Sequence, residues 1–404
     1  MSARAPTSPT AADAPRAAPR GFFSLELLDN RYPGLHGLRV LAIVSVVQYH
    51  VTWILWGEQG VPLDRRFVDG SLSVFFGMDL FFVLSGFLIG SILLRSLRQS
   101  GTQDLRRFYV RRIFRTFPSY YVVLTILALT LPLTALQRQH LVFEYTYLTN
   151  FLPLHRPQVI MFWGWSLALE EQFYLAVPIL FFVLHRMKSE RARIVLLVVL
   201  WAAALVVRLS IYFAFRPWND FILYGAVYFR TYTRFDTLVM GILLAFVEQR
   251  YRSEIGAWLR HPLHRALLGV TALTCLWLLL RPGIFGANHV QIVHIFTWGT
   301  VTSVMYFCVL LLLLHGDGWV HRALALPVFR RTATLGYGVY LVHIPLIDHV
   351  LVPVAHWAVE RGVSLTLFWP VALAAVLAAS FAIGYAMHVL VEKPSLRLRE
   401  RLSA

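Results

Sequence analysis

Ionisable side chains interrupt several long apolar segments of this 404-residue chain, and they are the first candidates for chemistry. Arg39 and His50 stand 11 residues apart in GLRVLAIVSVVQYH, which places both on one face of a helix, about 16 Å apart along its axis. Asp79 lies in GMDLFFVLSGFLI, and Glu170 and Glu171 lie in WSLALEEQFYL. A histidine beside a carboxylate is an oriented general base that can take a proton from a hydroxyl. The pattern predicts catalysis by His50 with one of these carboxylates; the alternative is a snorkelling arginine and a histidine that serves packing alone.

The most basic stretch of the sequence, residues 95–117, holds seven arginines and no lysine. Arg112 and Arg115 are one helical turn apart, and a guanidinium group can bind phosphate through two parallel hydrogen bonds, whereas lysine acts as a point charge. This segment therefore predicts a phosphate site, although a cytoplasmic loop that contacts anionic lipid has the same composition. The sequence contains no P-loop, GxGxxG motif or metal-ligand spacing.

Composition decides which class of fold must position these residues. The hydrophobic class makes up 58% of the chain and charged residues only 14%, where about 25% is usual in soluble proteins. So few charges cannot cover a soluble surface, which excludes secreted, fibrous and disordered proteins. The net charge of +16 is then explained by basic cytoplasmic loops without any nucleic-acid partner. The two cysteines, Cys275 and Cys308, lie in apolar runs and are interpreted as core residues.

Ten segments approach the roughly 20 apolar residues that a spanning helix needs. They are residues 38–56, 72–95, 118–136, 164–185, 194–215, 233–249, 265–281, 293–315, 335–354 and 368–391. Alternate connecting segments hold 26 and 8 basic residues, so the positive-inside rule predicts an even number of spans with both termini in the cytoplasm. The expected fold is an all-α multipass membrane bundle of about ten helices. We expect a disordered cytoplasmic tail at residues 1–30 and a membrane domain at residues 31–404.

In this arrangement the candidate base and carboxylates share one depth. His50, Asp79, Glu170 and Glu171 all fall roughly 9 to 10 Å below the outer surface, at 1.5 Å per residue. Ionisable groups inside a membrane are costly and mark functional interiors. His343 lies near the middle of the ninth span, where a hydrogen bond from Tyr340 or a backbone carbonyl would satisfy it structurally. Arg234 and Asp236 lie at one end of the sixth span and could form only a helix-end ion pair.

The sequence resembles the membrane-bound acyltransferase family 3 over about residues 31–400. Six motifs occur in the family's order. They comprise the arginine and histidine of the opening motif at Arg39 and His50, the second-helix motif with Asp79, Ser85 and Gly86, the basic RxxR segment at Arg112 and Arg115, the motif with Trp165, Ser166 and Glu170, and the closing motifs YLVHIP and VEKP. One departure is His36 in HGLR, where the family commonly has aspartate. No hydrolase-like domain follows the tenth predicted span, so the resemblance is to the stand-alone members.

This resemblance implies a membrane O-acyltransferase that moves an acyl group, expected to be acetyl, from acyl-CoA to a hydroxyl of a glycan, glycolipid or natural product. Acyl-CoA would be a cosubstrate, with no tightly bound cofactor, and the protein would lie in the bacterial cell membrane. The implied roles are catalysis by His50, Glu170, Glu171 and Asp79, binding of CoA by Arg39, Arg112 and Arg115, and substrate binding by Trp165, Ser166, Tyr340 and His343. Direct transfer and a covalent acyl-enzyme are both chemically consistent with these residues.

Two other classes of function fit the buried polar layer. A proton-coupled solute or lipid transporter could use the histidine and carboxylates as a relay. A sensory or scaffold membrane protein could use the same layer only to specify packing. The transporter class predicts duplicated hydropathy and does not need an arginine-lined phosphate site.

Overall fold

The computed structural model describes residues 23–101, 104–152, 158–215, 224–280 and 291–402, and this part of the chain contains helices and no strand. The long helices are α1 (Gly34–Thr52), α3 (Gly77–Ser100), α4 (Leu105–Thr130), α6 (Trp165–Arg186), α7 (Glu190–Ala214), α10 (Asp236–Trp258), α11 (Pro262–Leu280), α13 (Thr302–Leu314), α15 (Pro327–Leu346) and α17 (Leu365–Met387). Shorter helices are α2 (Arg65–Leu72), α5 (Ala135–Tyr145), α9 (Thr231–Arg234), α12 (Gln291–Phe296), α14 (Trp319–Leu324), α16 (Val352–Glu360) and α18 (Lys393–Leu402). Single turns or π-helical pieces join them at η1 (Trp53–Glu58), η2 (Thr149–Phe151), η4 (Phe162–Gly164), η5 (Tyr224–Tyr228), η6 (Thr297–Val301), η7 (Ile347–Leu351) and η8 (His388–Glu392).

Nine helical segments of the described chain are long and apolar enough to cross a membrane. They correspond to nine of the ten predicted spans, and the predicted all-α multipass class is confirmed. The remaining predicted span, residues 233–249, covers the end of α9 and the first part of α10. Helix α10 is long enough to span but carries charged residues such as Glu248 and Arg250 in its second half. Its first half is buried from Asp236 to Phe246, so its environment is protein.

Helix α10 packs most extensively against α3, and glycine makes this close approach possible. A Cβ atom at Gly86 of α3 would clash with the carbonyl group of Leu238, and one at Gly241 of α10 would clash with the backbone of Val83 and Phe87. Small residues at such crossings let two membrane helices approach backbone to backbone. The α3–α10 pair therefore forms a rigid centre on which other helices are placed.

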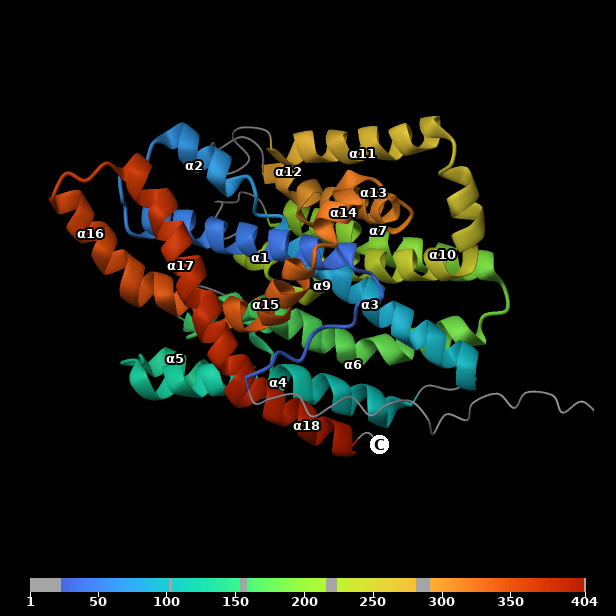
Figure 1. Ribbon diagram of the computed structural model, residues 1–404, viewed down its shortest axis with the longest axis horizontal. Coiled ribbons are helices and arrows are strands. Elements are labelled where there is room, and N and C mark those ends of the chain that lie inside the picture. The colour runs from blue at the N-terminus through green and yellow to red at the C-terminus, as the bar shows by residue number, and fades with distance from the viewer. Residues whose placement is uncertain (1–22, 102–103, 153–157, 216–223, 281–290, 403–404) are drawn as a thin grey trace, which may run out of the picture.

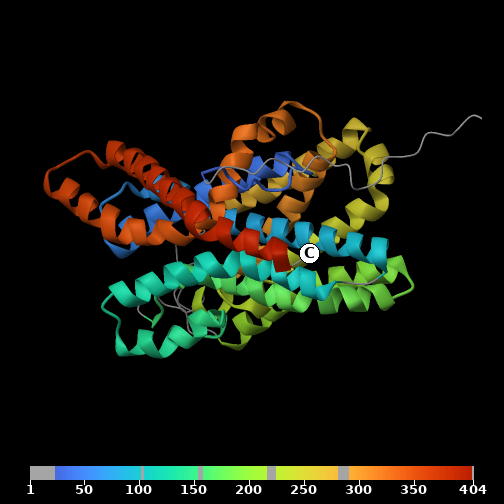
Figure 2. The same cartoon turned by 60° about the horizontal axis from the view of Figure 1, so that its bottom comes forward.

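The long helices form the body of the molecule, and α1 and α15 cross near its middle (Figure 1). Helices α15 and α17 pack together, and the chain then continues through η8 into α18, which runs beside α4 in both views (Figures 1 and 2). Helices α1, α3, α4, α6 and α15 thus meet around one interior region, although they are far apart in the sequence. The candidate site lies there.

The segment before α1 is attached to the far end of the chain. The backbone N–H of Glu26 donates to His388 Nε2 at 3.0 Å, and Lys393 Nζ donates to the carbonyl oxygen of Ser24 at 2.7 Å. The Arg330 guanidinium donates to the carbonyl oxygen of Leu28 at 2.7 Å. Residues 24–28 belong to the tail that the sequence analysis expected to be disordered, and here they lie against α15, η8 and α18. Residues 1–22 of that tail lie outside the described part of the chain.

Candidate active site

The three arginines expected to bind the donor line one cavity of about 170 Å³. Arg39 comes from the first turns of α1, and Arg112 and Arg115 come from successive turns of α4. The guanidinium carbon of Arg112 lies 5.6 Å from the centre of the Tyr174 ring, which holds the side chain by a cation–π contact. Its Nε atom is buried and has no hydrogen-bond partner among the described residues. This end of the cavity is therefore strongly attractive to an anion.

Glu170 faces the same cavity from α6. Its carboxylate accepts a short hydrogen bond from the hydroxyl of Ser85, which also lines the cavity from α3. Attraction between Glu170 and the three arginines balances part of their charge. The neighbouring Glu171 is partly buried and does not line the cavity. Of the two adjacent carboxylates, Glu170 is thus the one placed to contact a bound molecule.

A pair of hydroxyl groups forms another part of the cavity wall. Ser166 Oγ and Tyr340 Oη are 2.6 Å apart, and the Tyr340 hydroxyl donates to the carbonyl oxygen of Trp163 at 2.7 Å. Both residues line the cavity. Trp165 does not line it, and packs instead against the rings of Phe82 and Tyr228. The structure therefore brings two of the four predicted substrate-binding residues to the cavity.

His50 and His343 form a hydrogen-bonded pair next to Tyr340, beyond the residues that line the cavity. His343 Nε2 and His50 Nδ1 are 3.0 Å apart, and His343 Nδ1 is 2.6 Å from the carbonyl oxygen of Tyr340. A carbonyl oxygen can only accept, so His343 Nδ1 carries the hydrogen, and a neutral His343 then accepts at Nε2. His50 must donate from Nδ1, which leaves the lone pair of a neutral His50 on Nε2. The bonds thus fix the tautomer of His50 that a general base needs.

The sequence analysis expected a carboxylate in this orienting position, and the structure places His343 there. The expected structural bond from His343 to a backbone carbonyl is present, through Tyr340. His343 was also expected to bind substrate, and its side chain is fully buried. Its contacts make it a partner of His50 instead.

Asp79 has a different partner from the one expected. Its Oδ1 accepts from Arg234 Nη2 at 2.6 Å, and both side chains are fully buried. The expected ion pair between Arg234 and Asp236 is wrong, because Asp236 pairs with Arg208 at 2.8 Å. One buried pair therefore joins α3 to α9, and the other joins α7 to the start of α10. Asp79 lies in the packing core of the α3–α10 centre, where a charge partner is essential.

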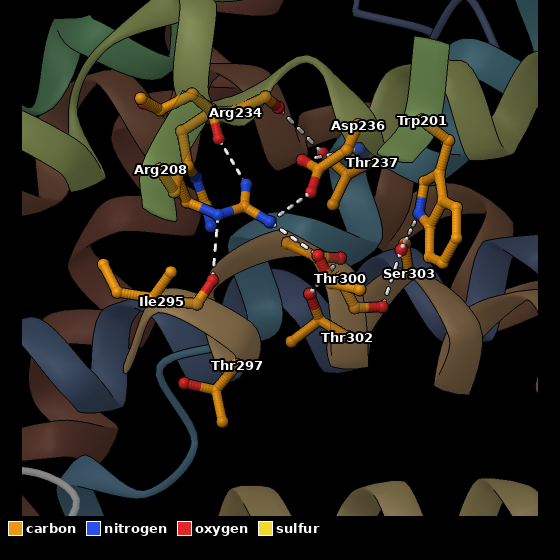
Figure 3. A network of polar contacts seen from close by, with 12 residues as sticks. Trp201, Arg208, Arg234, Asp236, Thr237, Ile295, Thr297, Thr300, Thr302 and Ser303 are labelled. Carbon is orange, nitrogen blue, oxygen red and sulfur yellow. Dashed lines mark hydrogen bonds and ion pairs between the residues drawn. The ribbon is translucent and has the colours of Figure 1, made fainter. Parts of the chain in front are cut away.

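Figure 3 shows the hydrogen bonds and the ion pair that the Arg208 side chain forms inside the protein. Its guanidinium donates to the carbonyl oxygens of Ile295 and Thr233, to the Asp236 carboxylate, and to Thr300 Oγ1. These acceptors come from two stretches of chain, residues 233–236 and residues 295–300. The second stretch includes part of η6, where Gly299 has a φ of +107°. A Cβ atom at Gly299 would clash with both carboxylate oxygens of Asp236. Arg208 is a structural residue that sequence reasoning missed, although its charge within an apolar segment was the available signal.

A second residue missed by sequence reasoning, Glu144, anchors the chain that leads into α6. It is fully buried in α5, and its two carboxylate oxygens accept from the backbone N–H groups of Ile160 and Met161, each at 2.8 Å. The next residue, Phe162, lies edge-on to His50 with ring centres 6.3 Å apart. Glu144 therefore fixes the segment that packs over the histidine pair.

The acyltransferase domain of family 3 matches residues 32–385, nearly the whole membrane bundle. The chain belongs to this family, so the predicted family and the predicted acyltransferase class are confirmed. It is 29% identical to "Putative peptidoglycan O-acetyltransferase YrhL" of Bacillus subtilis, over 79% of this chain and 49% of that protein. It is 30% identical to "O-acetyltransferase OatA" of Staphylococcus aureus, over 53% of this chain and 34% of that protein.

The chain thus spans about half the length, or less, of these curated relatives. The expectation that it is a stand-alone member stays a prediction. No solved structure matches the chain.

Proposed function

We propose that this chain is a membrane O-acetyltransferase that moves an acetyl group from acetyl-CoA to a hydroxyl of a glycan such as peptidoglycan. The observation that carries the proposal is the connection of two features. Arg39, Arg112 and Arg115 line a cavity, and Tyr340 in its wall binds His343, which orients His50. The names of the curated relatives support acetyl as the group and a glycan as the acceptor.

The donor would bind through its phosphates at the arginine end. The cavity volume of about 170 Å³ suits the thioester arm of the donor and is too small for a whole acyl-CoA. The nucleotide would therefore remain outside, against the arginines, whose guanidinium groups match phosphate oxygens in pairs. Glu170 and Ser85 would then lie along the arm, since both line the cavity and are joined by a hydrogen bond.

Transfer needs a base because a hydroxyl is a poor nucleophile at neutral pH. His50 Nε2 would take the proton as the hydroxyl oxygen bonds to the thioester carbon. The carbon–sulfur bond then breaks, and the leaving thiolate takes the proton from His50. The products are an acetyl ester and CoA with a free thiol, and His50 returns to its starting tautomer. The same base would also serve a covalent acyl-enzyme, in which a side chain takes the place of the acceptor for one step.

The test uses membrane vesicles that contain the full chain, radiolabelled acetyl-CoA and peptidoglycan fragments. Label should enter the glycan fraction and be released by mild alkali as expected for an ester, and its incorporation should fall by about 10² or more with His50→Ala. A proton-coupled transporter would instead move a solute across the vesicle without label transfer. A sensory or scaffold protein would do neither, and either result contradicts the proposal.

The donor site is tested separately with Arg112→Lys and Arg115→Lys. Each keeps the charge and loses the paired hydrogen bonds, so KM for acetyl-CoA should rise while kcat changes little. Arg111→Lys is the matched control, because Arg111 is exposed on the same helix and does not line the cavity. If all three variants keep the KM of the unaltered protein, these arginines do not bind the donor.

A further inference from the structure

A second cavity lies at the ends of four helices, away from the arginine cavity. It has a volume of about 500 Å³ and is enclosed by the last turns of α3 and α6, the first turn of α7 and the second half of α10. The lining residues are Leu94, Leu97, Arg98, Phe181, Leu184, His185, Glu190, Arg193, Phe246, Gln249 and Arg250. None of them lines the arginine cavity. Neither the proposed reaction nor its residues give this cavity a role.

Its lining divides into two chemical parts. Leucine and phenylalanine side chains supply an apolar wall, and Arg98, Arg193 and Arg250 supply a basic rim. Glu190 is the one carboxylate among the described residues that line it. Because α3, α6 and α7 begin or end here and each belongs to a candidate membrane span, the rim lies where lipid headgroups meet the protein. An apolar wall below a basic rim matches an acyl chain below a phosphate.

The contacts of the rim leave most of its positive charge uncompensated. Arg98 Nη1 donates to the carbonyl oxygen of Gln249 at 3.1 Å, and Arg193 donates to the carbonyl oxygen of Met187. These acceptors are neutral, so they hold the guanidinium groups in place without cancelling their charge. Among the described residues, Arg250 is the one rim arginine with an acidic partner, at 2.5 Å from Glu190. The three arginines and the one glutamate together leave the rim with the charge of two cations.

We propose that this cavity binds an anionic glycerophospholipid from the surrounding bilayer. Its phosphate would contact Arg98 and Arg193, and the start of its acyl chains would lie against the leucine and phenylalanine side chains. Basic pockets between membrane helices bind anionic headgroups in this way. The site is separate from the donor cavity, so the inference does not depend on the proposed function.

The test measures lipid retention by the full chain, purified in detergent, by native mass spectrometry with added phosphatidylglycerol or phosphatidylcholine. The unaltered protein should retain phosphatidylglycerol in clear preference. The double variant Arg98→Gln with Arg193→Gln should bind it about tenfold or more weakly, because it removes two basic contacts to an anionic headgroup. Arg260→Gln with Arg322→Gln is the matched control, since both arginines are exposed and line neither cavity.

The double variant could also lose lipid because it misfolds, so a second variant is chosen that should increase lipid retention. Glu190→Gln removes the acid from the rim and releases Arg250, so it should strengthen retention of phosphatidylglycerol. Equal retention of both lipids by the unaltered protein would overturn the proposal, and so would full retention by the double variant. Displacement of the lipid by millimolar inorganic phosphate or CoA would also overturn it, because the cavity would then be a site for a soluble phosphate ligand.

Discussion

The histidine pair differs from the histidine and carboxylate arrangement that the sequence suggested, because a neutral partner orients His50. A carboxylate would stabilise the imidazolium that forms during proton transfer, whereas His343 supplies only a directed acceptor. His343 is itself fixed by the Tyr340 carbonyl oxygen, 2.6 Å from Nδ1. The pair therefore acts by holding one tautomer and one ring orientation.

The first prediction concerns this pair. His50→Ala should reduce turnover by about 10² to 10⁴, the usual contribution of a positioned general base. His50→Gln should be nearly as inactive, because an amide keeps polarity and cannot carry a proton. Initial rates of label transfer at saturating acetyl-CoA measure both. Turnover of the Gln variant at the level of the unaltered protein would make His50 a structural residue.

His343→Gln is the companion variant and tests positioning. Glutamine can still accept from His50 Nδ1, so it should retain more activity than His343→Ala, while KM for acetyl-CoA stays unchanged in both. An equal loss of activity in the two variants would indicate that His343 serves packing, because the hydrogen-bond acceptor kept by glutamine would then make no difference. A raised KM would place His343 in donor binding.

At the residue scale the sequence predicted which side chains gather at one cavity better than which ones pair. Arg39, Arg112, Arg115 and Glu170 do line one cavity, because the motifs that carry them are specific. The partner of Asp79, in contrast, is 155 residues away at Arg234. Depth along a helix fixes how far a residue lies from the membrane surface, and it does not fix which neighbouring helix the side chain faces.

Between elements, one close contact depends on an unusual backbone conformation, and it lies at η6. Gly299 lets the chain turn at a φ of +107° directly against Asp236, whose carboxylate binds Arg208. The helices α7, α10 and α12 therefore meet at one point that needs a residue without a side chain.

The second prediction is that Gly299→Ala destabilises the protein. A side chain at this backbone conformation costs about 1 to 3 kcal/mol, and displacing the Asp236 carboxylate from Arg208 adds to that. Gly269→Ala is the control, because Gly269 lies within α11 with open space around its Cβ position, where alanine should stabilise by roughly 0.5 to 1 kcal/mol. Thermal unfolding in detergent measures both. Equal melting temperatures for the two variants would show that η6 is not constrained in this way.

The third prediction concerns Glu144 and pH. Burial raises the pKa of Glu144 above its ordinary value of 4.5, with the hydrogen bonds from Ile160 and Met161 acting in the opposite direction. The folded state therefore binds more protons than the unfolded chain above pH 4.5. Stability relative to Glu144→Gln should fall as pH rises from 4.5 through the raised pKa, because the carboxyl must then ionise while buried.

Melting temperatures of the two proteins across this range measure the effect. Glu254→Gln is a control for which the pH dependence of stability should run in the opposite direction. The reason is that the hydrogen bond from Ser253 lowers the pKa of the exposed Glu254. A protein that gains stability over Glu144→Gln as pH rises would contradict the assigned direction.

The helices themselves could be predicted because apolar length is a strong signal, and nine of ten predicted spans meet that criterion. Glu144 could not be found in this way. Its function comes from two backbone N–H groups 16 and 17 residues later in the chain. A lone glutamate in ALQRQHLVFEY reads as a surface residue of a short amphipathic helix.

For the molecule as a whole, the fourth prediction concerns its orientation. The uneven distribution of basic residues predicts that both termini and residues 95–117 lie in the cytoplasm. Single cysteines at positions 110 and 404, in a chain without Cys275 and Cys308, should react with a membrane-impermeant thiol reagent only after the cells are opened. A cysteine at position 361 should react in intact cells. The reverse pattern would contradict this orientation, because it would place both termini and residues 95–117 outside the cytoplasm.

The attachment of residues 24–28 has a consequence for how the enzyme can be handled. Leu28 forms part of the wall of the arginine cavity, and its neighbours are bound to α15, η8 and α18. Removal of residues 24–28 would therefore take away part of that wall together with its contacts to α15, η8 and α18. A truncation of the chain that is meant to keep the arginine cavity intact must begin before residue 24.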